Sequence, residues 1–128
     1  MQDLYLGIDI GSTTVKVVAL DRAGTLLAHR YLRSEGRPRQ TLLRAAADLR
    51  RHIPPQRIAA VGLTGSGGEP IARLIGGRHI NELVAQTRAV GQYYPQARTS
   101  LKLAGRTANF CRWPGMIKAA KWCWLILL

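Results

Sequence analysis

The sequence predicts a mixed α/β fold in which an antiparallel three-strand meander is followed by α/β units. Apolar or β-branched runs at residues 4–10, 15–21 and 25–32 are separated only by short turns, as in a β-meander. An amphipathic segment at 41–53 and a short apolar run at 57–65 come next. Strands that first follow one another and then alternate with helices predict one sheet with mixed strand directions.

The segment at 41–53 is predicted to be a helix that ends at Pro54-Pro55. Its arginines form one face, and its expected buried face consists of Leu42, Leu43, Ala46 and Leu49. A second, shorter helix is expected from Glu69, with Pro70 in its first turn and two glycines after it. A brief strand at 79–80 follows, and Asn81 is expected to cap a helix from Glu82 to about Tyr93.

The stretch "GIDIGSTTVK" at residues 7–16 has the composition of a phosphate loop between two antiparallel strands. Backbone N–H groups of such a turn can converge on an anion, and glycine lets the backbone approach it closely. The expected binding residues are Gly11, Ser12, Thr13, Thr14 and Lys16. Asp9, at the end of the first strand, could hold a hydrated Mg²⁺ ion or orient water. The alternative is an ordinary hairpin turn.

Three segments in order, "LGIDIGSTTVKVVALD", "AAVGLTGSGGEPIARLIGG" and "INELVAQTRAVGQYYPQAR", resemble the BadF/BadG/BcrA/BcrD ATPase family. Members of this family activate 2-hydroxyacyl-CoA dehydratases and benzoyl-CoA reductases. The resemblance covers residues 4–98. It implies an actin-like (ribonuclease H-like) ATPase fold, of which residues 1–98 would form the first subdomain only.

The resemblance also implies a cofactor and partners. Family members bind ATP with Mg²⁺, form homodimers around a [4Fe–4S] cluster, and drive electrons into a partner dehydratase or reductase. The cluster cysteines have no counterpart within residues 1–98. Because groups on the far side of the phosphates are also missing, we expect this chain alone to be inactive as an ATPase.

Site residues are carried over only where this sequence matches the family's motifs. Thr64 and Gly65 match a Thr-Gly turn that binds the nucleotide, although "SGG" follows where many members have an aromatic residue, Gly and Arg. Glu82 matches an acid that would orient the metal or the attacking water, so Asp9 and Glu82 are the expected catalytic residues. A carboxylate favoured by the helix dipole is the alternative for Glu82. Many members have His at the position of Gln86, so no role is predicted there.

The net charge of +12 suggests a different class, a small basic nucleic-acid-binding protein. A sugar-kinase-like fragment is a further alternative, within the same fold. Neither a signal peptide nor an apolar run long enough for a membrane span is present, so we expect a cytoplasmic protein without membrane partners. Nucleic-acid partners are not expected either, because the case for them depends mostly on the basic, tryptophan-containing segment 99–128.

Residues 99–128 differ in composition from the rest of the chain. They contain no acidic residue but both cysteines, all three tryptophans and the only phenylalanine. Where the family continues with a strand and a second phosphate loop, this chain reads "SLKLAGRTAN" from Ser100. Suitable codons for that segment, read one base earlier, encode "VIEIGGQDSK", which has the form of that loop. We therefore expect residues 99–128 to be an out-of-frame tail without native structure.

Overall fold

A computed structural model describes residues 3–104 and 107–112, with eleven elements. The strands are β1 (Leu4–Ile10), β2 (Thr14–Leu20), β3 (Leu26–Arg33), β4 (Ile58–Thr64), β5 (Arg78–His79), β6 (Thr99–Ala104) and β7 (Thr107–Arg112). The helices are α1 (Pro38–Arg50), η1 (Pro55–Arg57), α2 (Gly68–Ile75) and α3 (Glu82–Tyr93). Within the described residues, no helix is both long and apolar enough to cross a membrane.

Five strands form one mixed sheet in the order β3-β2-β1-β4-β5. The three strands of the meander are antiparallel, whereas β4 runs parallel to β1 and β5 runs parallel to β4. This confirms the predicted α/β class and the predicted order of elements through α3. The parallel pairing of β1 and β4 brings the ends of these two strands, Asp9 and Thr64, side by side.

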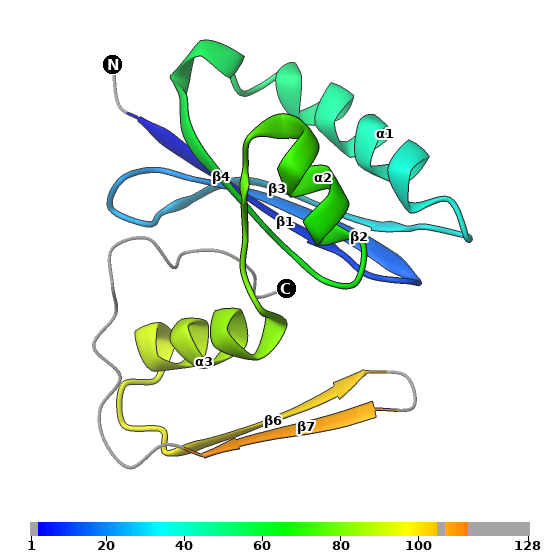
Figure 1. Ribbon diagram of the computed structural model, residues 1–128. Helices are drawn as coiled ribbons and strands as arrows, with labels where there is room; N and C mark the ends of the chain where they lie inside the picture. The colour runs from blue at the N-terminus through cyan, green and yellow to red at the C-terminus, as the bar shows by residue number, and fades with distance from the viewer. Residues whose placement is uncertain (1–2, 105–106, 113–128) are drawn as a thin grey trace.

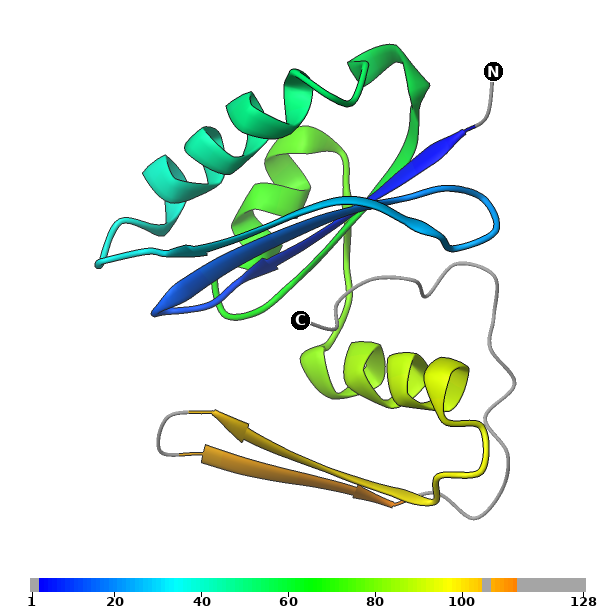
Figure 2. The same cartoon turned by 180° about the vertical axis from the view of Figure 1, so that it is seen from behind.

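Helices α1 and α2 cover the same face of the sheet (Figures 1 and 2). Alternate residues of β1 and β2 point into this layer, because successive side chains of a strand point to opposite faces. They form one core with residues of both helices, consisting of Leu4, Ile8, Ile10, Val15, Val17, Ala19, Ala45, Leu49, Ile53, Leu63 and Ala72. Asp9 lies between two core positions and therefore points to the opposite face.

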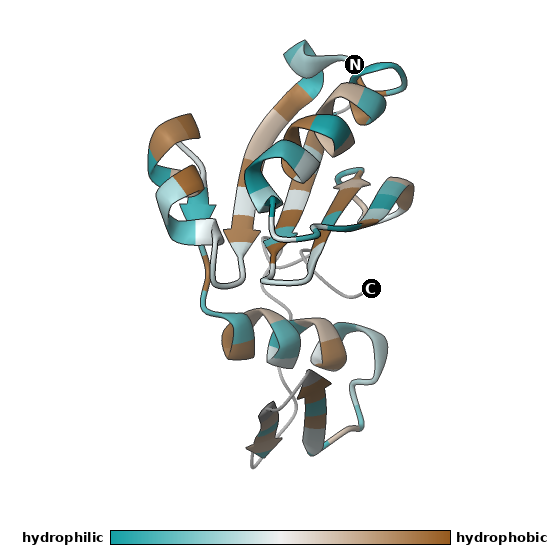
Figure 3. Ribbon diagram, turned by 90° about the vertical axis from the view of Figure 1, so that its right-hand side faces the viewer, coloured by the Kyte–Doolittle hydropathy of each residue, from teal (hydrophilic) through white to brown (hydrophobic). Residues whose placement is uncertain are grey.

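Helix α3 and the β6–β7 hairpin lie beyond the edge of the sheet at which β1 and β4 end (Figure 3). The start of α3 confirms the predicted cap: the side chain of Asn81 accepts a hydrogen bond of 2.9 Å from the N–H of Leu83. The helix extends over the predicted range. It thereby carries Glu82 to the edge of the sheet where Asp9 is located.

The predicted bounds of α1 were wrong, and its predicted buried face was right only for Leu49, which is buried, and Leu42, which packs partly buried against the core. The helix begins at Pro38 rather than at residue 41, because proline suits the first turn, and it ends at Arg50. Its buried residues are Thr41, Ala45 and Leu49, whereas Leu43 is 71% exposed and Ala46 is exposed. The buried residues are thus four positions apart and lie on one side of the helix, and this side differs from the one that the apolar residues of the sequence suggested.

Strands β6 and β7 form an antiparallel hairpin within the segment for which we expected no native structure. In a half-buried strand the apolar side chains face the packed side and the polar ones face solvent, whereas β6 has the opposite arrangement. The polar residues Ser100 and Lys102 face α3, whereas Leu101, Leu103 and Phe110 are 60%, 73% and 67% exposed. The out-of-frame origin of residues 99–128 remains a prediction, and residues 113–128 lie outside the described residues.

Candidate functional site

The turn between β1 and β2 is held in place from outside by Ser34, which follows β3. The N–H of Ser34 donates to the carbonyl of Thr13, and its hydroxyl donates to the carbonyl of Ser12, both at 2.8 Å. Within the turn, the N–H of Gly11 donates to the carbonyl of Thr14 at 2.9 Å. Ser34 is 1% exposed, whereas Ser12 and Thr13 are exposed at the tip. The turn is therefore fixed on its inner side and open to a ligand on its outer side.

Asp9 and Lys16 are partners across β1 and β2 and form an ion pair. Lys16 Nζ donates to Asp9 Oδ2 at 3.2 Å, and only 6% of Asp9 is exposed. Lys16 Nζ also lies 5.6 Å from the centroid of the Tyr31 ring, within the range of a cation–π contact. Tyr31 is the β3 neighbour of Lys16, and no motif in the sequence predicts this contact. These contacts hold the lysine beside the buried carboxylate.

Thr64 and Gly65 support Asp9 from the end of β4. The hydroxyl of the fully buried Thr64 donates to the carbonyl of Ile80 at 2.7 Å, which ties β4 to the segment before α3. Gly65 has a φ of +86°, and a β-carbon there would lie 2.5 Å from Asp9 Oδ1. Glycine is therefore needed for the carboxylate to lie where it does. Their predicted contact with a nucleotide remains a prediction.

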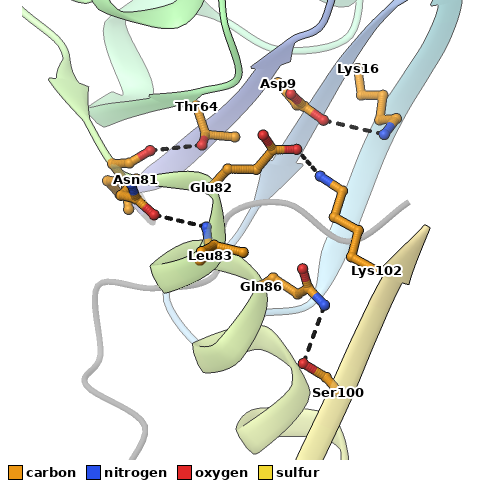
Figure 4. Close-up of polar contacts among 10 residues, drawn as sticks. Asp9, Lys16, Thr64, Asn81, Glu82, Leu83, Gln86, Ser100 and Lys102 are labelled. Atoms are coloured by element: carbon orange, nitrogen blue, oxygen red, sulfur yellow. Dashed lines mark hydrogen bonds and ion pairs between the residues drawn. The ribbon is translucent and has the colours of Figure 1, made fainter. Parts of the chain in front are cut away.

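Two residues one turn apart on α3 make polar contacts with β6 (Figure 4). Glu82 forms an ion pair with Lys102. The Nε2 of Gln86 donates to Ser100 Oγ at 3.2 Å. Gln86 is only 8% exposed, and its Oε1 has no hydrogen-bond partner among the described residues. The sequence contained no signal for Gln86, Ser100 or Lys102, because their proximity depends on how β6 packs against α3.

These side chains share a cavity of about 350 Å³ between the sheet edge, α3 and β6. The predicted residues that line it are Asp9, Lys16, Thr64 and Glu82. Gln86 and residues 100–103 line it as well, whereas Gly65 and residues 11–14 do not. The structure thus brings both predicted catalytic acids and the predicted lysine to one cavity, with the turn residues outside it.

The charges in the cavity interact with one another. Burial lowers the pKa of Lys102 below its usual range, the nearby Asp9 raises it, and Lys16 lowers it. The cavity is therefore lined by two ammonium groups, those of Lys16 and Lys102, and by two carboxylates. Two acids and two lysines can bind an anionic ligand together with a cation. The lysines can leave their carboxylate partners to bind the anion, and the carboxylates can then bind the cation.

The oxygen atoms around the cavity suit Mg²⁺, which prefers carboxylate, amide and water oxygens. The unpartnered Oε1 of Gln86 adds an amide oxygen to the two carboxylates. Among the described residues, no three His, Cys, Asp or Glu side chains form a group that could hold a metal ion by themselves. The described part of the chain contains one cysteine, Cys111, which is half-buried. These residues therefore include no set of thiolates that could bind a [4Fe–4S] cluster.

Comparison with solved structures identifies similar folds. Component A of the (R)-2-hydroxyglutaryl-CoA dehydratase of Acidaminococcus fermentans matches 91% of this chain at 20% identity, with a TM-score of 0.78. The activator of the 2-hydroxyisocaproyl-CoA dehydratase of Clostridium difficile, with bound ADPNP, matches 92% at 25% identity, with a TM-score of 0.71. The Aquifex aeolicus PPX-GPPA enzyme matches 90% at 12% identity, with a TM-score of 0.59.

The chain covers 46%, 44% and 50% of these three proteins, respectively. No family model matches the sequence, and no curated protein matches it. The likeness confirms the fold predicted from the sequence: the chain has the first part of an actin-like (ribonuclease H-like) ATPase fold. The fold is also that of known dehydratase activators.

Proposed function

We propose that this chain is the phosphate-holding first part of an activator-type ATPase. Residues 11–14 and Lys16 contact the phosphates of ATP, and Asp9 holds the accompanying Mg²⁺ through water. Glu82 orients the metal or the attacking water, and Thr64 and Gly65 complete the nucleotide site. The observation that carries the proposal is the buried Asp9–Lys16 pair beside a turn that is fixed by Ser34 and open at its tip.

The similar structures support this proposal. One of them, a dehydratase activator 25% identical to this chain, was solved with bound ADPNP. By analogy we propose ATP hydrolysis coupled to electron transfer into a 2-hydroxyacyl-CoA dehydratase or benzoyl-CoA reductase, in a homodimer that shares a [4Fe–4S] cluster. The comparisons favour neither the sugar-kinase-like nor the nucleic-acid-binding alternative.

We also propose that residues 99–128 are out of frame. The reversed alternation of the hairpin supports this, because a strand selected to pack against α3 would turn its apolar side chains inward. Leu101, Leu103 and Phe110 instead face solvent. The genomic DNA after codon 98, read in all three frames, tests this proposal: a continuous frame encoding "GGQDSK" is expected, and its absence would contradict it.

A protein with the frame restored after residue 98 tests the ATPase proposal. We expect it to hydrolyse MgATP, and Asp9→Ala or Lys16→Ala should each lower kcat/KM at least tenfold, because each removes a charge from the phosphate site. Arg73→Ala is the matched control, since it removes an exposed charge that pairs only with Glu69 among the contacts seen. Unchanged turnover in both site variants would show that the turn does not hold the phosphates.

A further inference from the structure

We propose that the cavity is a divalent-cation site, and that Lys102 occupies it as a tethered cation in this chain. The oxygen ligands are the carboxylates of Asp9 and Glu82 and the amide of Gln86. The inference rests on the proposed function, since it concerns the cation that accompanies the nucleotide. It adds a ligand, Gln86, and a competitor, Lys102, which lies in the proposed out-of-frame segment and therefore acts in this 128-residue chain and not in the frame-restored protein.

The two carboxylates reach the cavity from different elements. Asp9 comes from the end of β1 and Glu82 from the first turn of α3, and both line the same space (Figure 4). The hydrogen bond between Thr64 and the carbonyl of Ile80 fixes the end of β4 against the segment that leads into α3. The two acids are thus brought to one cavity by two different elements, and each is paired with a different lysine.

The amide of Gln86 is a second, independent observation that indicates a ligand in the cavity. Its side chain is more than nine-tenths buried, and the hydrogen bond from Nε2 to Ser100 orients the amide. Gln86 lines the cavity, and its buried Oε1 accepts no hydrogen bond from any described residue. A buried amide oxygen without a donor is unfavourable. A hydrated cation in the cavity satisfies it, either directly or through a bound water.

Lys102 already supplies a positive charge at this place. Its ammonium pairs with Glu82, and its charge also interacts with that of Asp9. Lys102 and Ser100 are two residues apart on β6, and Glu82 and Gln86 are one turn apart on α3. These spacings are similar, so the strand lies along the helix with two matched polar contacts. A divalent cation must therefore displace Lys102 from Glu82 before it can bind.

The test is the affinity of the 128-residue chain for Mn²⁺ alone, measured from the electron paramagnetic resonance signal of free Mn²⁺ at low salt. Lys102→Met should bind Mn²⁺ at least tenfold more tightly than the unmodified chain, because it removes the competing charge. Lys102→Arg should bind as weakly as the unmodified chain. Arg73→Met is the matched control, since it changes the net charge equally but at an exposed site away from the cavity.

Two further variants assign the ligands. In the Lys102→Met background, Glu82→Gln and Gln86→Leu should each abolish most of the gain. Circular dichroism verifies that each variant is folded, and Lys102→Gln replaces Lys102→Met if the latter is not. An unchanged Mn²⁺ affinity in a folded Lys102→Met or Lys102→Gln variant overturns the inference, and so does a gain that survives Glu82→Gln.

The metal measurement contains no nucleotide, so the two proposals can fail separately. If Lys102→Met gains Mn²⁺ affinity but neither protein responds to ADPNP, the nucleotide proposal fails and the cation site stands. If ADPNP binds at the β1–β2 turn but Lys102→Met leaves Mn²⁺ affinity unchanged, the cation site fails and the nucleotide proposal stands.

Discussion

Gly65 lies so close to the carboxylate of Asp9 that a β-carbon at this position would come within 2.5 Å of Asp9 Oδ1. It would come equally close to the carbonyl oxygen of Ile10, and the φ of +86° is unfavourable for any other residue. The turn after β4 therefore packs directly against the end of β1, with no space for a side chain between them. The position of Asp9 depends on a residue 56 places later in the sequence because the parallel pairing of the two strands brings them together.

Gly65→Ala should lower the free energy of unfolding by about 3 kcal/mol, because the backbone of Ile10 cannot move away easily. Urea unfolding measures this. Gly36→Ala is the matched control: φ there is +74°, but nothing lies within 4 Å of the added carbon, so a loss of only about 1 kcal/mol is expected. Equal losses in the two variants would show that the contact with Asp9 and Ile10 is absent.

Asn81→Ala should destabilise the start of α3, because the Asn81 side chain accepts the hydrogen bond from the N–H of Leu83. The expected loss is about 1 kcal/mol in the free energy of unfolding. Asn81→Asp keeps an acceptor at the cap and should remain close to the unmodified chain. If Ala and Asp behave alike, the cap does not stabilise the helix that carries Glu82.

Asp48 on α1 gives a prediction about pH. The hydrogen bond from Arg30 on β3, 3.0 Å long, is the main cause that lowers the pKa of Asp48 below its ordinary value of 3.8. Because the pKa is lower in the folded state, the stabilisation is present above about pH 4 and is lost as the pH falls through the lowered value. Asp48→Asn should therefore lower the unfolding midpoint at pH 6 and match the unmodified chain near pH 2. A difference between the two unfolding midpoints that persists near pH 2 would contradict this.

The sequence predicted the sheet well because each strand of the meander is a single apolar run bounded by a turn. The start of α3 was also predictable, since Asn81 acts through its immediate neighbours. The buried face of α1 was not, because the choice between Ala45 and Leu43 depends on the rotation of the helix against the sheet. Gln86 and Lys102 carry no local pattern at all. They matter only through packing between α3 and β6, which sequence spacing does not reveal.

The measurement that tests the central claim most directly is a titration of the 128-residue chain with Mg-ADPNP, followed by amide NMR. With only one side of the phosphate site present, we expect millimolar affinity and shifts concentrated at residues 9–16, and Lys16→Ala should abolish them. Shifts confined to other parts of the chain would contradict the assignment of the β1–β2 turn as the phosphate site. Saturable micromolar binding would contradict the interpretation of this chain as one part of a larger ATPase site.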